Sequence, residues 1–397
     1  MKDVIGRAKF ETIGEDSFKR LDCFVPRNDV IRMQFVVPRN DVIRMQFVAS
    51  HNDVKRMQFV ASRNDVNRTT DKNLFIGVEI GASKHQVAIG DGDGNIYETI
   101  AGKVVLQDGA DGVLAWMKEK IPLMIEKSAA YGGKVEAIGI GFGGIIESAT
   151  GLSLVSVQVA GWEMFNIKEW FEKTFRLPTV VVNDTVTGGY AEYCTGSGKG
   201  SKQFFYTNIG SGIGGVFILN GEYYDGLGFG AAYFGHTYIP DWTSEVPGAL
   251  CKVETMCSGF GIEKRLRRKG YVPADSAMME MCGGKSEHIT CKMLEDAGRA
   301  KDTFALMEID RLARSYAVGL SNVITLFSPD CVSIGGGVAK MGDLLLEPVR
   351  RYVDELVFIS SKGKYKIVAC CHGDNAVLTG SILFAKKSLL KSGGFNG

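Results

Sequence analysis

The chain has 397 residues, of which 45% are hydrophobic, and its 46 basic and 45 acidic residues leave a formal net charge of +1. Such a length allows two compact lobes. Because the charges balance, the protein as a whole has no electrostatic field that would attract nucleic acid or an anionic membrane. The nine cysteines lack framework spacing, and we find neither an early signal peptide nor an apolar run that spans a bilayer. We therefore expect a cytoplasmic protein with reduced thiols and a small-molecule partner.

The first seventy-odd residues contain a tandem repeat with a twelve-residue period. Residues 27–30, with the sequence Arg-Asn-Asp-Val, recur almost unchanged at 39–42, 51–54 and 63–66. Packing alone does not demand such identity, because cores accept many hydrophobic swaps, so recent duplication is the simpler explanation. A short β-solenoid or an added interaction strand is the alternative. We predict that residues 1–72 form a poorly ordered extension.

Hydrophobic periodicity and turn residues predict the elements of the first half. An antiparallel meander opens it, with a glycine turn after the first strand and a hairpin turn over 91–95 after the second. Helices and strands then alternate. In chain order, the expected elements are strands over 74–80, 86–90 and 96–100, a helix over 112–130, a strand over 135–141, a helix over 167–175 and a strand over 177–184.

The second half repeats this opening. A strand, a glycine loop and a hairpin turn at Asn220-Gly221 come first, and helices dominate from 257 to 327. The expected strands cover 203–209, 216–219, 222–225, 331–334 and 365–369, one further helix ends near 356, and the last covers 376–390. Two halves with the same opening indicate a duplicated α/β fold with an active cleft between its lobes.

A candidate catalytic acid stands at the end of a buried strand. The β-branched run 177–182 stops at Asn183 and Asp184, and the glycine-rich segment 208–215 follows after a short helix. Open α/β sheets place reactive side chains at the carboxyl ends of their strands, and glycines let backbone N–H groups approach an anion closely. An aspartate that accepts a proton beside a phosphate cradle predicts phosphoryl transfer to an alcohol.

A second candidate phosphate site is the turn that follows Glu79. The backbone of 81–83 and the Lys84 amine can face phosphoryl oxygens, while Glu79 binds Mg²⁺ directly or through water. The 210–215 loop lacks the following helix that a dinucleotide fingerprint requires, and 198–200 lacks the spacing of a P-loop. We therefore expect a phosphate cradle of another kind.

Taken together, these motifs resemble those of the ROK family of sugar kinases and repressors, over about residues 73–390. The first phosphate motif of that family, Asp-x-Gly-Gly-Thr-Lys, is similar to 79–84, with Glu79 in place of the aspartate. The other matching segments, in family order, are Gly141-Phe142-Gly143-Gly144, Gly161-Trp162, Asn183-Asp184, Ala191-Glu192, 210–215 and the adenosine motif at 334–338. The resemblance implies a two-lobed actin-like ATPase fold, which is ribonuclease H-like, with duplicated α/β domains and an inter-lobe cleft.

The resemblance also implies roles for single residues. Asp184 is then the general base for the accepting hydroxyl, ATP with Mg²⁺ is the phosphoryl donor, and a homodimer is expected. The implied sugar contacts are Asn183, Gly144, Trp162, Tyr233, His236 and Glu254. The implied nucleotide contacts are Gly81, Ala82, Ser83, Lys84, Gly210, Ser211, Gly212, Gly214, Gly335, Gly336 and Gly337. The smaller lobe would cover residues 73–185 and 375–392, and the larger lobe residues 186–374.

The sequence departs from the family at two places. The family's Ala-Gly-Glu-x-Gly-His corresponds to residues 231–236, where Tyr233 replaces a sugar-binding glutamate, so hydroxyl recognition at that corner must differ. The family's Cys-x-Cys-Gly-x-x-Gly-Cys zinc segment is absent, since Cys251 and Cys257 stand six residues apart. We therefore expect no structural zinc, and His236 would bind sugar without it.

The candidate residues also have plainer interpretations. Asp184 could be a helix cap, Trp162 could fill a lobe interface, Glu192 could be a surface acid, and His236 could be structural. We interpret the basic run 265–269 as a solvated helix face rather than an anion or nucleic-acid patch.

Three functional hypotheses follow. The first is an ATP-dependent, Mg²⁺-requiring carbohydrate kinase. The second is a sugar-responsive regulator, although residues 1–72 show neither the paired helices nor the basic footprint of a DNA-binding domain. The third is a sugar-binding protein without catalytic activity, suggested by Tyr233 and the missing zinc segment.

Overall fold

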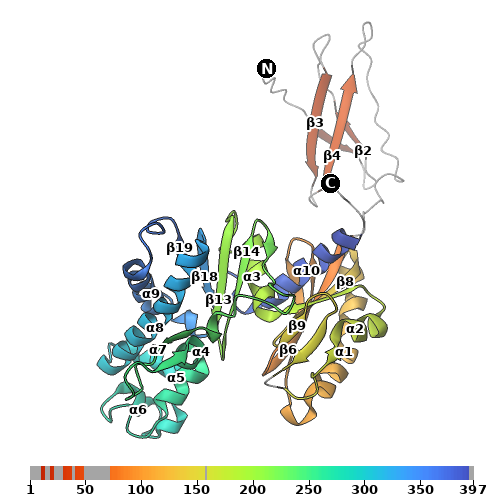
Figure 1. The fold of residues 1–397 in the computed structure, drawn as a ribbon. Coiled ribbons are helices and arrows are strands. Elements are labelled where there is room, and N and C mark those ends of the chain that lie inside the picture. Colours follow the sequence, from red (N-terminus) through yellow and green to blue (C-terminus); the bar gives the residue numbers. More distant parts are fainter. Residues whose placement is uncertain are drawn as a thin grey trace. The chain divides into compact units, whose positions relative to one another are not determined.

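The computed structural model describes residues 72–156 and 159–392, together with four short strands nearer the N-terminus (Figure 1). The chain divides into two compact units, Met1–Thr70 and Asp71–Gly397. In the first unit β1 (Phe10–Ile13) pairs with β2 (Phe18–Leu21), and β3 (Val30–Val37) pairs with β4 (Asp41–Val48), both antiparallel. The rest of the N-terminal extension lies outside the described residues, so its poor order stays a prediction.

The first large sheet has the strand order β12-β8-β5-β6-β7. Its strands are β5 (Lys72–Ile80), β6 (Lys84–Asp91), β7 (Ile96–Lys103), β8 (Gly133–Phe142) and β12 (Thr179–Asn183). β5, β6 and β7 form the predicted antiparallel meander, while β8 is parallel to both β5 and β12.

The second large sheet repeats this topology strand for strand, in the order β15-β14-β13-β18-β19. Its strands are β13 (Gln203–Ile209), β14 (Ile213–Leu219), β15 (Glu222–Tyr223), β18 (Cys331–Gly335) and β19 (Lys366–Ala369). The first three are antiparallel, and β18 is parallel to both β13 and β19. The prediction of a duplicated α/β fold is confirmed.

Helices cover both faces of the first sheet. Leu74 and Ile76 share a core with Met117 of α1 (Gly109–Glu126) and with buried residues of α2 (Ile167–Phe175). Phe75, between them in the strand, instead packs with Ile382 of α10 (Ala376–Ser392). Because successive strand residues point to opposite faces, the C-terminal helix covers the face that α1 leaves open.

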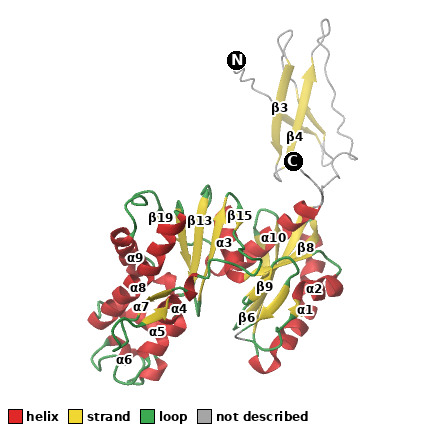
Figure 2. Ribbon diagram, viewed as in Figure 1, coloured by secondary structure: helices red, strands yellow, loops and turns green. Residues whose placement is uncertain are grey.

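Two helices lie between the sheets (Figure 2). α3 (Asp184–Thr195) packs against α10 and also contacts β13 and β14. Val186 of α3 shares a core with Phe204 and Tyr206 of β13, whereas Phe205 faces the opposite core, which includes α8 (Thr303–Phe327) and α9 (Asp343–Leu356). α3 therefore begins at the edge of the first sheet and packs against the second sheet.

The remaining elements are short or belong to the helical part of the second half. A three-stranded sheet of β9 (Ile145–Glu147), β10 (Leu152–Val155) and β11 (Phe165–Asn166), and the pair β16 (Tyr238–Pro240) and β17 (Leu250–Lys252), were not predicted. The other helices are α4 (Val253–Cys257), α5 (Gly259–Leu266), α6 (Ala277–Met281) and α7 (Cys291–Arg299).

Several predicted strand bounds are wrong. The strand expected over 96–100 ends at Lys103, and the strand expected over 216–219 begins at Ile213, so the loop after β13 covers only residues 210–212. The strand expected to reach Asp184 stops at Asn183, because Asn183 caps the helix that Asp184 begins. The strand expected over 222–225 covers only Glu222–Tyr223.

Candidate active site

The predicted loops meet at the carboxyl ends of parallel strands. In the first sheet, Ile80 of β5 and Asn183 of β12 both pair with Phe142 of β8. In the second sheet, Asn208 of β13 pairs with Gly335 of β18. Because neighbouring parallel strands end together, the turns that follow them share one edge in each sheet, which is where open α/β sheets bind ligands.

Asp184 is the first residue of α3 and is positioned by the cap before it. Asn183 Oδ1 accepts hydrogen bonds from the N–H groups of Thr185 (3.0 Å) and Val186 (3.3 Å), and Asn183 Nδ2 donates to Gly144 O (3.1 Å). Asp184 Oδ1 accepts a further hydrogen bond from Thr185 N–H (2.7 Å). Asn183 thus fixes the helix start and the turn after β8 together, while its sugar contact stays a prediction.

The environment of Asp184 suits a proton acceptor. Burial raises the pKa of its carboxyl to about 6, and the Glu79 carboxylate also raises this pKa. The hydrogen bond from Thr185 N–H lowers it, but by less. A Cβ placed on Gly143 would lie 3.3 Å from Asp184 Oδ2, so this oxygen faces the turn after β8. A carboxyl group that ionises near neutrality can take a proton from an alcohol at the working pH.

The last residues of β5 include a second, oriented carboxylate. Glu79 is nearly buried, and its Oε2 accepts a hydrogen bond from Gln86 Nε2 (2.7 Å) and lies 3.4 Å from Lys84 Nζ. Gly81 N–H donates to Lys84 O (3.0 Å), which closes the turn. Glu79 therefore has a fixed direction at the same sheet edge as Asp184, and its role as a metal ligand stays a prediction.

The glycine-rich segment 208–215 comprises the end of β13, the turn 210–212 and the start of β14, and it touches the start of α3. Gly214 N–H donates to Asn208 Oδ1 (2.8 Å), and Thr185 Oγ1 lies 3.5 Å from the same oxygen. A Cβ on Gly214 would lie 2.2 Å from Thr185 Oγ1, so only glycine allows this approach. Ile213 N–H donates to Glu254 Oε2 (2.8 Å) at the other side of the loop. Asp184 and the predicted phosphate cradle are therefore neighbours.

Sequence reasoning missed two of these contacts. Thr185 and Asn208 adjoin predicted motif residues, but they carry no signal of their own. Their contact joins α3 to the second sheet, and it depends on how the two halves pack. Glu254 was predicted as a sugar contact, and the structure adds its hydrogen bond to the glycine loop, which sequence spacing does not reveal.

The triple glycine after β18 presents open backbone beside this loop. Gly336 has φ +90°, and a Cβ there would lie 2.5 Å from the Ile209 carbonyl oxygen, so both conformation and space require glycine. Gly337 has φ −62° and no heavy atom within 4 Å of its Cβ position. The 3-10 helix η5 (Val338–Met341) follows. Close ligand approach is possible here, and the nucleotide contact stays a prediction.

Trp162 does not lie at an open surface. Its side chain is 1% exposed and packs edge-on against Phe142 (5.2 Å between ring centroids) and Phe165 (5.6 Å). The structure therefore places Trp162 in the core of the first half, beneath the turn that begins at Gly143. A direct sugar contact of this indole stays a prediction.

Tyr233 and His236 adjoin each other on the second half. The Tyr233 hydroxyl donates to Phe229 O (2.6 Å), and burial raises the pKa of this phenol. The Tyr233 and His236 rings meet edge to face at 6.3 Å, and His236 Nδ1 lies 3.2 Å from Lys252 Nζ. Both side chains are exposed enough to reach a ligand, and their sugar contacts stay predictions.

Glu192 is a buried anchor and not a surface acid. Its carboxylate accepts hydrogen bonds from the N–H groups of Ser197 (2.9 Å), Cys371 (2.8 Å) and His372 (2.7 Å), and from the Ser197 hydroxyl (2.7 Å). Burial alone would raise the pKa of Glu192, but these hydrogen bonds hold it below its ordinary value. The surface interpretation is therefore wrong, and Glu192 ties α3 to the segment before α10.

Metal and membrane features were searched in the described part of the chain. There, no group of three or more His, Cys, Asp or Glu side chains is arranged to hold a metal ion. The expectation of no structural zinc stays a prediction. Within the same residues no helix is both long and apolar enough to cross a membrane.

Known proteins with similar sequences and structures include both kinases and a regulator. The glucokinase of Halalkalibacterium halodurans is 30% identical over 289 residues, which cover 70% of this chain and 85% of that one. The xylose repressor of Caldicellulosiruptor bescii is 24% identical over 81% of this chain and 80% of its own. A ROK family glucokinase from Streptomyces griseus, solved with glucose and AMPPNP, has a TM-score of 0.67 and 26% identity, covering 79% of this chain and 100% of that one.

The family model described as ROK family matches residues 75–388, nearly the whole of the second unit. That match, the duplicated sheets and the structural likeness to a ROK family glucokinase and a ROK hexokinase confirm the predicted resemblance and the two-lobed actin-like ATPase fold. The chain belongs to the ROK family.

Proposed function

We propose that this protein is an ATP-dependent sugar kinase in which Asp184 is the general base. The observation that carries the proposal is the position of Asp184 at the head of α3. Its carboxyl has a pKa of about 6, and Thr185, the next residue, contacts the glycine loop of the other half. This arrangement supports a proton acceptor next to a place where phosphoryl oxygens can bind.

Each part of the site contributes a separate action. Asp184 Oδ2 takes the proton of the accepting sugar hydroxyl, which attacks the terminal phosphoryl group. The N–H groups of Gly81, Gly210, Ile213 and Gly214 already donate within the protein. The backbone N–H groups of Ala82, Ser83, Ser211 and Gly212 therefore bind phosphoryl oxygens, and 335–337 let the adenosine end lie close to the chain. Lobe closure over the inter-lobe cleft would exclude water and suppress hydrolysis.

The residues present fit Mg²⁺ with a phosphate ligand. Glu79 and Asp184 are oxygen donors near enough for the Glu79 charge to raise the pKa of Asp184. Mg²⁺ usually takes one or two carboxylates together with substrate phosphates. Glu79 would hold the ion, directly or through water, and the bound ion would neutralise phosphoryl charge. The hydrogen bond that Glu79 accepts from Gln86 fixes the direction of the Glu79 carboxylate.

The sugar class is a hexose or a hexose derivative. The name glucokinase for similar proteins supports this class, and Asn183, Gly144, Trp162, Tyr233, His236 and Glu254 are the proposed contacts. Tyr233 offers one hydroxyl, already donated to Phe229 O, where the family has a carboxylate. Hydroxyl recognition at that corner should therefore differ from that of a glucokinase.

We also propose that the protein is a cytoplasmic homodimer. In each subunit, the smaller lobe would comprise residues 73–185 and 375–392, and the larger lobe residues 186–374. The packing of α10 on β5 and β8 supports the assignment of the C-terminal helix to the first lobe.

A sugar-responsive regulator is the second candidate, and the likeness to a xylose repressor favours it. Coupled ADP release with Mg·ATP separates the two functions. The panel contains hexoses, N-acetyl hexosamines and ketoses, with Asp184→Asn as the blank. Sugar-dependent turnover that disappears in Asp184→Asn supports the kinase. Sugar binding by calorimetry without turnover, together with salt-dependent binding to duplex DNA, contradicts it in favour of the regulator.

A further inference from the structure

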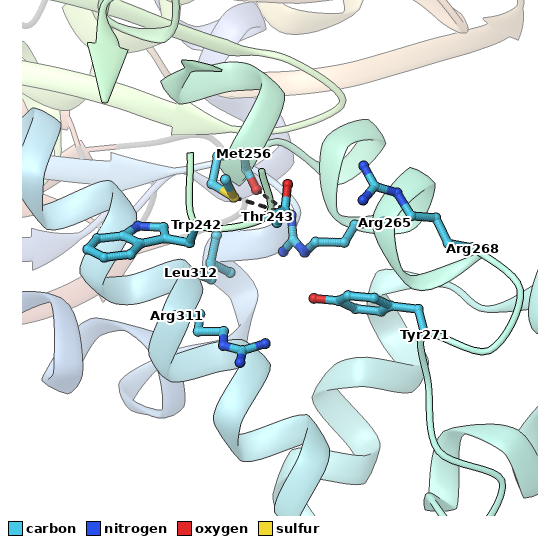
Figure 3. Close-up of a pocket in the computed structure, with 8 residues that line it drawn as sticks. All are labelled: Trp242, Thr243, Met256, Arg265, Arg268, Tyr271, Arg311 and Leu312. Carbon is cyan, nitrogen blue, oxygen red and sulfur yellow. Dashed lines mark hydrogen bonds between the residues drawn. The ribbon is translucent and has the colours of Figure 1, made fainter. Parts of the chain in front are cut away.

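A cavity of about 300 Å³ lies in the second half, away from the predicted site residues (Figure 3). Its walls come from α4, α5 and α8, from the loop after β16 and from the loop after α5. Three of the residues that line it are Arg265, Arg268 and Arg311, and two aromatic residues, Trp242 and Tyr271, join them. None of the residues lining it is among those assigned to sugar, nucleotide or metal.

Arg265 is the centre of the cavity wall. Only 6% of its side chain is exposed, so the earlier interpretation of 265–269 as a solvated face is wrong for this residue. Arg265 Nε donates to Glu308 Oε2 (3.0 Å), and Nη1 donates to Met256 O (2.9 Å). Nη2 has no hydrogen-bond partner among the described residues. The two N–H groups of Nη2 are therefore available to a ligand or to water in the cavity.

The other charges around Arg265 are arranged to leave a positive excess. Glu308 Oε1 accepts hydrogen bonds from Arg311 Nη1 (2.9 Å) and the Tyr271 hydroxyl (2.8 Å). In Figure 3 these two side chains and Arg265 point toward one another. Arg268 makes no side-chain hydrogen bond within the described chain and is exposed. Three arginines against one glutamate leave an excess of two positive charges.

We propose that this cavity is a second ligand site, which binds a phosphomonoester dianion attached to a ring. A dianion matches the excess charge, and the fork of an arginine suits phosphate oxygens. The Trp242 indole is half exposed, and the Arg314 guanidinium lies 5.0 Å from its ring centroid, so the opposite face of the indole is the apolar surface for the ring. The volume is of the size that small metabolites fill. The proposal does not depend on the proposed kinase activity.

Isothermal calorimetry on the full chain tests the site. The probes are inorganic phosphate, phenyl phosphate, a hexose 6-phosphate and a nucleoside monophosphate, which distinguish a bare anion, a sugar and a nucleotide as the source of the phosphate. We expect saturable binding of the ring-bearing probes, tighter than that of inorganic phosphate. A hexose 6-phosphate that binds more tightly than the nucleotide identifies a sugar phosphate site, and the reverse identifies a nucleotide site.

The variants assign that binding to the cavity. Arg311→Gln should weaken it at least about tenfold, because a charge-assisted hydrogen bond is lost. Arg268→Gln should weaken it about threefold, because an exposed charge is partly screened. Arg268→Gln removes no described side-chain contact, so its folding is not in question. Arg351→Gln, which removes another half-exposed, ion-paired arginine, is the matched control and should leave binding unchanged.

Two results would overturn the proposal. One is the absence of saturable binding by every probe at millimolar concentration. The other is binding that Arg311→Gln and Arg268→Gln leave at the wild-type affinity, which would place the ligand elsewhere, for example in the predicted cleft. Both variants must also unfold at the same temperature as the wild type, so that weaker binding reflects a change at the site and not a loss of fold.

Discussion

The two five-stranded sheets share one topology but carry different residues at their carboxyl edges. The edge of the first sheet holds the carboxylates of Glu79 and Asp184, and Asp184 has a pKa raised to about 6. The edge of the second holds two glycine-rich turns without acidic residues in their own sequences, and the Glu254 carboxylate that adjoins the first turn accepts a hydrogen bond from Ile213 N–H. The halves therefore differ in the residues that follow equivalent strands and not in the order of the strands.

This difference suggests a division of labour between the lobes. Carboxylates can accept a proton and bind a cation, whereas exposed backbone N–H groups bind anions. α3 joins the two, since its first residue is Asp184 and its second contacts the glycine loop. If the division is correct, changes at the first edge should affect turnover, and changes at the second should affect nucleotide binding.

The largest expected effect is at Asp184. Asp184→Asn should lower kcat by at least about a hundredfold, because general bases contribute roughly 10² to 10⁴-fold. The amide can still accept the Thr185 N–H hydrogen bond, so the helix start should persist. The dissociation constant for Mg·ATP, measured by calorimetry, should stay within about threefold. Turnover at the wild-type rate would show that the carboxylate edge has no catalytic role.

The second edge is tested at Gly336. Gly336→Ala should lower the free energy of unfolding by about 2 kcal/mol or more, because a Cβ meets the Ile209 backbone at positive φ, and nucleotide affinity should fall with it. Gly337→Ala is the control, since its φ is −62° and its Cβ position is open. Urea unfolding should separate the two variants. Equal stability of both would mean that the turn adapts freely.

The attachment of α3 to the segment before α10 is tested at Glu192. Glu192→Gln should lower the free energy of unfolding by about 1–2 kcal/mol at pH 7, because an amide N–H₂ would face backbone donors. The pKa of Glu192 is depressed, so its stabilisation is present above its unfolded pKa and is lost as pH falls through the folded value. The difference between wild type and variant should therefore shrink below about pH 4. Glu119→Gln, at an exposed position of α1, should change stability by less than about 0.5 kcal/mol.

The remaining prediction concerns the pH dependence of Asp184. Because its folded pKa is raised, protonation favours the folded state: this contribution is complete below pH 4 and is lost as pH rises through about 6. Asp184→Asn should therefore be more stable than wild type at pH 7 by up to about 3 kcal/mol, with no gain at pH 4. Carboxyl ¹³C NMR should show a midpoint near 6, and kcat/KM should decline below it. A midpoint near 4 would contradict the buried environment.

The fold was largely predictable because its signals are local. The β-branched runs, the glycine turns and the 220–221 hairpin identified the strands of both sheets to within a few residues. The end of β12 was misplaced by one residue, since Asn183 has an extended backbone and yet caps a helix. Motif order identified the family, but it did not show that Trp162 is buried or that Glu192 anchors the segment before α10.

These properties depend on contacts between residues far apart in the chain. Glu192 meets Cys371 and His372 only after α3 has packed against the segment that follows β19. Arg265 is buried because α8 places Glu308 beside it, which the basic run alone does not reveal. A run of basic residues has no sequence signal that separates one buried arginine from its exposed neighbours. Packing decides which member is buried.

The most direct test of the central claim is ³¹P NMR of the full chain incubated with Mg·ATP and the panel sugars. The account predicts a new phosphomonoester resonance that appears with a sugar in stoichiometric proportion to ADP, and its loss in Asp184→Asn, which still binds the nucleotide. Sugar and nucleotide binding by the wild type without any phosphomonoester, or the same product formed at the same rate by Asp184→Asn, would contradict it.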